Sequence, residues 1–173
     1  MNEEEIIKFS ELSNFFPKQK EALEASKRFK FVLFGGSVGS GKSRWLRWSM
    51  VYWLMKFFSK YKIKGIRAGL FCEDYVSLND RHLTKIKFEF PSWLGKFNEQ
   101  KHEFTLAPEY GSGIIAFRNL AEPENYLSVE FAVIGVDEIN RNPKTTFDML
   151  RSRHRWPGIK DVKFLAGCNP LGE

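Results

Sequence analysis

The segment from Gly36 to Ser43 constrains the fold of this chain more than any other, because it reads G-S-V-G-S-G-K-S. A glycine, four residues and then Gly-Lys-Ser is the spacing of a loop that cradles the phosphates of a nucleotide. The glycines let successive amides turn inward, the lysine brings positive charge to the β- and γ-phosphates, and the serine hydroxyl can ligate Mg²⁺. An apolar run at 29–34 precedes the loop and a longer one at 44–58 follows it. The motif therefore joins an expected strand to an expected helix, which is the context it requires.

A glutamine upstream of the loop is a candidate for reading the nucleotide base. Gln19 opens a helix-forming stretch at 18–25, directly behind Pro17. A primary amide donates and accepts at once and can bind the adenine edge, although a solvated helix residue is the alternative. We assign residues 1–28 to a helical adenine-binding segment and 29–173 to the core of a single ATPase domain. Besides Gln19, we expect the nucleotide to contact Gly36, Ser37, Val38, Gly39, Ser40, Gly41, Lys42, Ser43 and Arg44.

A second strong signal lies about a hundred residues further on. The run 131–136 is continuously apolar, as expected for a parallel strand buried on both faces, and it ends in Asp137 and Glu138. Acidic residues at the carboxyl end of such a strand face the ligand crevice. Asp137 can hold Mg²⁺ together with Ser43, and Glu138 can polarise a water for attack on the γ-phosphate. A solvated strand end is the alternative, which the upstream phosphate loop disfavours.

The remaining pattern predicts an α/β fold of three layers, a P-loop NTPase with a mostly parallel central sheet flanked by helices. We expect a second strand at 65–72, a helix from 73 that Pro91 ends, a β-hairpin of strands 102–106 and 113–117, a helix at 144–150 and a final strand at 162–166. The second hairpin strand is expected to extend the sheet at an edge. The helix at 44–58 is apolar on every face, which favours core packing over an aromatic platform for stacked bases.

Two further features are candidates for sensing the γ-phosphate. The densest basic cluster, at 151–155, follows the helix at 144–150, and one of its arginines could neutralise charge in the transition state. A solvated or DNA-facing basic surface is an equal alternative. Asn169 directly follows the final strand and would lie level with the phosphates, whereas an ordinary Asn-Pro turn is the alternative there.

Composition limits the class of protein. A chain of 173 residues with 43% hydrophobic residues suits one globular domain, and lysines and arginines interrupt every apolar run before it could span a bilayer. The acidic start at 1–5 lacks the pattern of a signal peptide. A net charge of +6 gives only weak support for a polyanionic partner. Cys72 and Cys168 lie far apart without metal-ligand spacing, so we expect buried free thiols in a reducing cytoplasm.

Four segments in this order resemble the ATPase half of the large terminase subunit of tailed bacteriophages, the motor that packages DNA into a procapsid. They are F-P-K-Q-K-E-A-L-E-A with Gln19, G-G-S-V-G-S-G-K-S, V-I-G-V-D-E and G-C-N-P. The resemblance implies an adenine-binding motif, Walker A, Walker B and a motif that couples hydrolysis to movement. It implies Glu138 as the catalytic carboxylate and Asn169 as the coupling residue. It also implies Mg²⁺-dependent ATP hydrolysis that drives double-stranded DNA into the procapsid.

The same resemblance implies partners and a location. The expected partners are double-stranded DNA, the portal protein and the small terminase subunit, with no membrane involved. The working motor would be a homo-oligomeric ring in the host cytoplasm, docked at the procapsid portal, and a fragment could be monomeric. Family members continue into a nuclease domain beyond the coupling motif, so we expect a truncated chain with ATPase chemistry and no DNA cleavage.

One departure from the family leaves the arginine finger open. Many members carry a basic residue inside Walker A or just before Walker B, where this chain has Ser37, Val38 and Ser128. The remaining candidates are Arg118, Arg151, Arg153 and Arg155. Three other functions share part of the pattern: a helicase-like or DNA-repair ATPase, which would need a second motor domain, a nucleotide switch without efficient turnover, and a nucleoside kinase, for which no acceptor site is evident.

Overall fold

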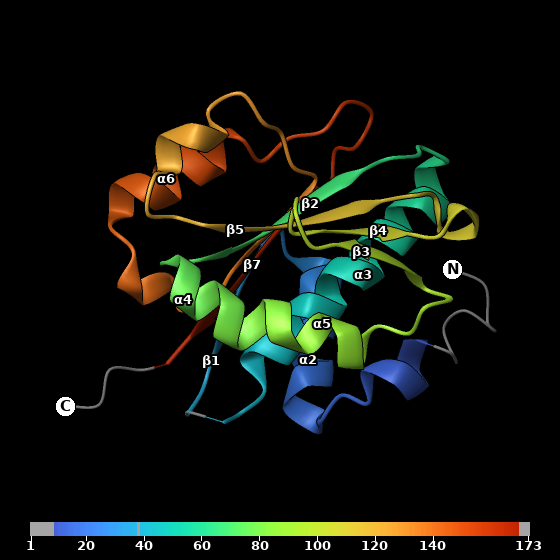
Figure 1. The fold of residues 1–173 in the computed structure, drawn as a ribbon, viewed down its shortest axis with the longest axis horizontal. Coiled ribbons are helices and arrows are strands. Elements are labelled where there is room, and N and C mark those ends of the chain that lie inside the picture. The colour runs from blue at the N-terminus through green and yellow to red at the C-terminus, as the bar shows by residue number, and fades with distance from the viewer. Residues whose placement is uncertain (1–8, 38, 170–173) are drawn as a thin grey trace.

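A computed structural model describes residues 9–37 and 39–169 and shows a seven-stranded sheet flanked by helices on both faces (Figure 1). The strands lie in the order β1-β7-β6-β2-β5-β4-β3. Their bounds are β1 Phe31–Gly35, β2 Arg67–Cys72, β3 Gly95–Asn98, β4 Glu103–Leu106, β5 Ile114–Asn119, β6 Val133–Val136 and β7 Lys163–Cys168. The predicted three-layer α/β class is confirmed.

The sheet is parallel where the candidate site lies. Strands β1, β7, β6, β2 and β5 pair in parallel, whereas β4 pairs antiparallel with both of its neighbours, β5 and β3. Gly35 pairs with Cys168, and Val136 pairs with Ala166. The carboxyl ends of β1, β7 and β6 therefore meet at one edge, so the loops that leave these three strands converge.

Two helical layers cover the sheet. One layer contains α2 (Pro17–Arg28), α3 (Lys42–Tyr61), α4 (Tyr75–Leu78), the π-helical turn η1 (Asn79–Leu83) and α5 (Thr84–Glu89). The other contains α6 (Lys144–Ser152) with the 3-10 turn η3 (Pro123–Tyr126), and Figure 1 shows α6 across the sheet from α2 and α3. The 3-10 turns η2 (Pro108–Tyr110) and η4 (Ile139–Arg141) lie in connections. Each layer has its own core: Leu70 packs in the first and its neighbour Phe71 in the second.

Helix α3 is the centre of the larger core. Trp45, Trp48 and Phe57 are among its fully buried side chains. Trp53 is also buried, and its indole N–H donates to Ser26 Oγ on α2 at 3.0 Å. These side chains pack inside the protein, so the core-packing interpretation of this helix is confirmed.

Two expectations need correction. Strand β5 lies inside the sheet between β2 and β4, and the strand at this edge is β3, which the sequence pattern does not indicate. Cys168 is half-buried, whereas Cys72 is buried as expected, and both thiols are free. Within residues 9–37 and 39–169, every helix is too short or too polar to cross a membrane.

Candidate active site

The phosphate-loop motif occupies the turn from β1 into α3. Gly39 and Gly41 have φ angles of 82° and 75°, the left-handed region that glycine adopts without steric cost. Gly41 is also the residue that caps the amino end of α3, where unpaired amides favour an anion. The turn therefore has the backbone that the motif predicts, and Val38 alone of its residues lies outside the described ones.

Lys42 is folded back over this loop. Its Nζ donates to the carbonyl oxygens of Gly36 at 2.8 Å and Ser37 at 2.9 Å, and to Ser40 Oγ at 3.0 Å. A fourth contact joins it to Asn169 Oδ1, at the end of β7. Lys42 is buried, and all its partners are neutral oxygens. An anionic phosphate would be a stronger partner for this ammonium than any of them.

Asn169 and Glu138 meet at the same point. The backbone N–H of Asn169 donates to Glu138 Oε2 at 3.3 Å, while its side-chain oxygen accepts from Lys42. Glu138 is buried and holds a left-handed backbone with φ of 51°, which is rare for a residue with a side chain and costs about 1–3 kcal/mol. The predicted sensor thus lies between the predicted catalytic carboxylate and the lysine of the predicted phosphate loop.

Asp137 faces Ser43 and presents one unused oxygen. Its Oδ2 accepts from Ser43 Oγ at 2.7 Å and lies 3.1 Å from His82 Nε2. Its Oδ1 is buried and has no hydrogen-bond partner among the described residues. Burial alone would raise the pKa of Asp137, but the hydrogen bonds from His82 and Ser43 and the charge of Arg81 lower it overall. A charged carboxylate with a free oxygen beside a serine hydroxyl fits a Mg²⁺ site.

The predictions made from the sequence did not include the groups that contact Asp137. His82 comes from the π-helical turn η1, and its ring contacts Arg47 of α3, whose guanidinium forms an ion pair with Glu89. Burial lowers the pKa of His82, the hydrogen bond and charge of Asp137 oppose this change, and the charges of Arg47 and Arg81 add to it, so the pKa is lowered overall. A signal for this network was present: Arg47 is an arginine in a helix that is apolar on every face, and a buried arginine requires partners.

Gln19 links the amino-terminal segment to the loop. Its side chain is buried, its Nε2 donates to the carbonyl of Gly41 at 2.8 Å, and its Oε1 accepts from the backbone N–H of Phe16 at 2.8 Å. A cleft of about 400 Å³ lies beside Gln19. It is lined by residues 16–19 of the amino-terminal segment and by residues 34–37 and Ser40 of the loop region. The side-chain nitrogen and oxygen of Gln19 can each form one further hydrogen bond. Recognition of the base by Gln19 stays a prediction.

The predicted arginines lie away from this cleft. The Arg44 side chain donates to the carbonyl oxygens of Leu12 and Ser13 and so holds the segment before α2, while its contact with the nucleotide stays a prediction. The carbonyl of Arg153 accepts from Phe131 N–H, at the amino end of β6. From there to Asp137 the chain runs six residues in extended form, roughly 20 Å, further than an arginine side chain reaches.

Arg151 lies two residues before Arg153, in the last turn of α6. Arg155 pairs with Glu130 and Arg118 with Glu103. An arginine supplied by a neighbouring copy stays a prediction. The described arginine that lies just beyond Glu138 is Arg141, which donates to Glu73 Oε1 at 3.1 Å.

Solved structures that resemble this fold include large terminases of bacteriophages. The large terminase of a thermophilic bacteriophage matches with a TM-score of 0.74 at 17% identity, over 90% of this chain and 39% of that one, and has also been solved with ADP and with ATP-γ-S. The ATPase domain of the Thermus phage P74-26 large terminase matches at 0.62 and 16%, over 96% and 70%. The HK97 bacteriophage large terminase matches at 0.65 and 8%, over 89% and 33%.

These likenesses confirm the resemblance at the level of the fold. The chain spans about two fifths of the length of the first of these proteins. No protein-family model matches the sequence, and no curated protein does either.

Proposed function

We propose that this chain binds Mg²⁺-ATP at the carboxyl edge of β1, β6 and β7 and hydrolyses it. The supporting observation is the convergence of Lys42, Asn169 and Glu138, three residues from three separate elements joined by hydrogen bonds. A buried lysine, an amide and a carboxylate that meet at a glycine-rich turn match the needs of phosphoryl transfer, which depends on positioning and charge stabilisation. The amino-terminal segment, residues 1–28, would bind the adenine, and residues 29–173 would form the rest of one ATPase domain.

Each residue of the site has one task in this proposal. Lys42 and the loop amides stabilise the charge on the β- and γ-phosphates. Ser43 and Asp137 hold Mg²⁺, which when bound neutralises phosphate charge. Glu138 orients a water in line with the γ-phosphate and accepts its proton.

Occupancy of the site would be sensed by Asn169. In the structure Lys42 bonds to the Asn169 side chain. A γ-phosphate would draw Lys42 away, because a charged partner forms the stronger hydrogen bond. Asn169 would then be released from Lys42 while its backbone still contacts Glu138. The end of β7 would thus differ between the ATP-bound and ATP-free forms, which is what coupling to movement requires.

The fold shared with the large terminases supports a place in phage DNA packaging. In this proposal ATP turnover drives double-stranded DNA through a portal, with the small terminase subunit as a partner and a ring of identical subunits as the working form. The arginine that completes each site would come from the neighbouring subunit, because Arg151 and Arg153 lie at the opposite edge of the sheet from their own site.

The test separates binding from turnover. Lys42→Ala should abolish ATP binding in titration calorimetry. Glu138→Gln should keep ATP affinity while phosphate release falls by at least about 100-fold, the scale of a lost general base. The exposed residues Lys20 and Glu109 supply matched controls, since Lys20→Ala and Glu109→Gln should change neither quantity. Retained ATP affinity in Lys42→Ala, or unchanged turnover in Glu138→Gln, would refute the corresponding role.

A further inference from the structure

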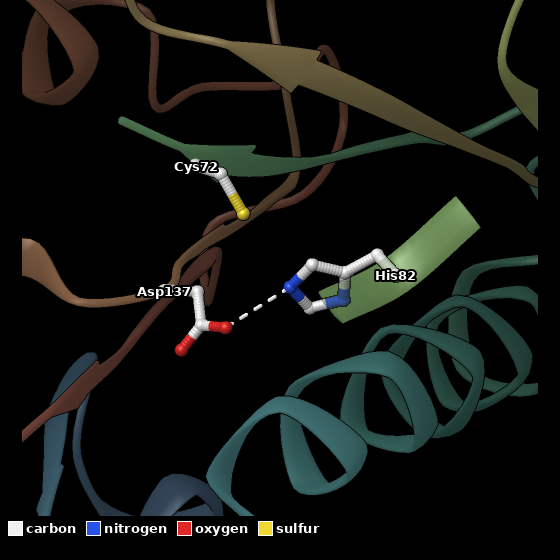
Figure 2. A group of neighbouring side chains, drawn as sticks. All are labelled: Cys72, His82 and Asp137. Carbon is white, nitrogen blue, oxygen red and sulfur yellow. Dashed lines mark hydrogen bonds and ion pairs between the residues drawn. The ribbon is translucent and has the colours of Figure 1, made fainter. Parts of the chain in front are cut away.

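A buried group of three side chains includes Asp137 of the proposed metal site and two residues that lie beside it. Cys72 at the end of β2, His82 in η1 and Asp137 after β6 place their ligand atoms within 4.8 Å of one another (Figure 2). His82 is fully buried, and its Nε2 lies 3.1 Å from Asp137 Oδ2. The sequence separates these residues by up to 65 positions, so only the fold brings them together.

Arg47 determines which nitrogen of His82 carries the proton. Its Nη1 lies 3.1 Å from His82 Nδ1, on the far side of the ring from Asp137. A guanidinium only donates hydrogen bonds, so Nδ1 must accept. A neutral imidazole with an accepting Nδ1 carries its proton on Nε2, and that N–H therefore donates to Asp137 Oδ2.

The position of Arg47 is itself fixed. Its Nε and Nη2 donate to the two carboxylate oxygens of Glu89 at 2.9 and 2.5 Å, and its Nη1 also donates to the carbonyl of Arg81 at 2.5 Å. A bidentate pair of this kind holds the guanidinium in one plane. The donor that faces His82 is thus held by contacts to two other segments of the chain.

These contacts orient the Asp137 carboxylate. Its Oδ2 accepts from Ser43 and His82, two donors from different elements, which fixes the plane of the group. The other oxygen, Oδ1, points toward Gly167 on β7, where a Cβ would lie 3.1 Å away, and has no hydrogen-bond partner among the described residues. The arrangement leaves one oxygen of Asp137 free in a defined direction.

We propose that His82 is a positioning residue for the metal site: its Nε2–H holds Asp137 so that Oδ1 faces Mg²⁺ or a Mg²⁺-bound water. This inference rests on the proposed Mg²⁺-ATP site and adds the residues that build it, with Arg47 and Glu89 fixing the ring. Such groups behind a metal ligand typically change metal affinity or activity by about 10- to 100-fold when removed.

The same hydrogen bonds argue against a metal bound by the three side chains themselves. A metal at His82 Nε2 would require the proton to move to Nδ1, where it would face the N–H of Arg47. The hydrogen bond between His82 and Asp137 is therefore a support for the carboxylate, with Cys72 beside it, and not part of a separate metal centre.

The first experiment measures the Mg²⁺-dependent part of ATP affinity. Titration calorimetry with ATP is run in Mg²⁺ and in EDTA on the wild type, His82→Leu, His82→Gln and the control His102→Leu, whose histidine lies beside Tyr75 and outside the site. His82→Leu should reduce the ratio of the two affinities by about 10- to 100-fold and leave the affinity in EDTA unchanged. Gln, which keeps a donor and an acceptor, should restore much of the ratio.

A purely structural role for His82 predicts a different result. It would lower the unfolding temperature without changing the ratio of affinities, and that outcome overturns the inference alone. A wild-type chain that binds no ATP in either condition overturns the proposed function as well, so the two failures are distinguishable.

The second experiment needs neither ATP nor a folded variant. The chain has three histidines, so ¹⁵N NMR of the imidazole nitrogens in the wild type can resolve each ring. His82 should show the neutral form with the proton on Nε2. A proton on Nδ1, or a charged ring, at neutral pH would overturn the inference.

Discussion

Replacing Arg47 with methionine should destabilise the fold strongly, because it leaves a buried network without its cation. Arg47 is 3% exposed and forms an ion pair with Glu89, whose side chain is 15% exposed. It also donates to the Arg81 carbonyl and to the His82 ring. Methionine has a similar length, so the change removes the charge and the donors with little loss of packing.

The magnitude follows from what remains unpaired. Removing one partner of a buried ion pair costs about 3–5 kcal/mol, mostly because the other charge stays buried. The partial exposure of Glu89 allows water to reach its carboxylate, which favours the lower end, about 3 kcal/mol. For a chain of this size that corresponds to a fall in melting temperature of roughly 6–12 °C.

Urea unfolding followed by tryptophan fluorescence measures this loss, since Trp45 and Trp48 are fully buried in the same core. The matched control is Arg47→Met combined with Glu89→Met, which removes both charges. The double variant should regain most of the stability, because a buried pair exchanged for apolar groups is close to neutral.

Two results would refute this reasoning. One is a loss below about 1 kcal/mol in Arg47→Met, which would mean that the pair is screened like an exposed one. The other is a double variant as unstable as the single one, because the loss would then not come from an unpaired carboxylate. The double variant should still show a weakened Mg²⁺-dependent ATP affinity, since His82 has lost its donor. The double variant therefore distinguishes the effect of Arg47 on stability from its effect on the orientation of His82.

Three further predictions concern acid stability, the loop and the ligand. Burial and the charge of Lys30 lower the pKa of His154 from 6.5 to about 4. The unfolded chain therefore takes up the proton first as the pH falls, and the free energy of unfolding should decrease by roughly 3 kcal/mol between pH 6.5 and pH 4. Urea midpoints should decrease with falling pH in the wild type but not in His154→Phe, and an equal decrease in the variant would contradict the assignment. Gly41→Ala would place a Cβ 2.5 Å from Gln19 Nε2, on a residue whose φ of 75° is unfavourable for alanine. Calorimetry should detect at least a tenfold loss of ATP affinity. An unchanged affinity would show that ATP binding does not depend on this loop conformation. Mg²⁺-ATP at about 100 times its dissociation constant should stabilise the chain by about 2.7 kcal/mol, which raises the melting temperature by roughly 5–10 °C. EDTA should remove most of this rise. An unchanged melting temperature would argue against a ligand that binds only the folded chain.

Local sequence was sufficient to predict the parts of the site that come immediately after a strand. Gly36–Ser43 and Asp137 with Glu138 each stand at the end of an apolar run, and a parallel sheet places such positions at one edge. The order of residues therefore predicted the phosphate loop, the acidic pair and Asn169 as neighbours, which the structure confirms.

Long-range pairing determined what the sequence did not indicate. Strand β3 is the short segment G-K-F-N, which has little β-propensity and is held by its pairing with β4. His82 lies in a stretch that reads as ordinary helix, and the π-helical turn there changes the direction of its side chain toward Asp137. Periodicity cannot predict such an insertion, because it depends on which partner the turn packs against.

The basic cluster shows a limit of a different kind. Arg151 and Arg153 follow β6 closely in sequence, yet α6 ends near the amino edge of the sheet, where Arg153 contacts Phe131. The sequence distance from Asp137 is short, but the helix runs away from the site. A charge count alone therefore could not decide which arginine faces the phosphates.

The most direct test of the proposed Mg²⁺-ATP site is a crystal structure of the chain with Mg²⁺ and ATP-γ-S. The triphosphate should lie along Gly36–Ser43 with Lys42 moved from Asn169 to the γ-phosphate, and the metal should be held by Ser43 and by Asp137 Oδ1, directly or through water. A nucleotide bound elsewhere, or a metal held by other carboxylates while Lys42 keeps its bond to Asn169, would contradict the proposed function.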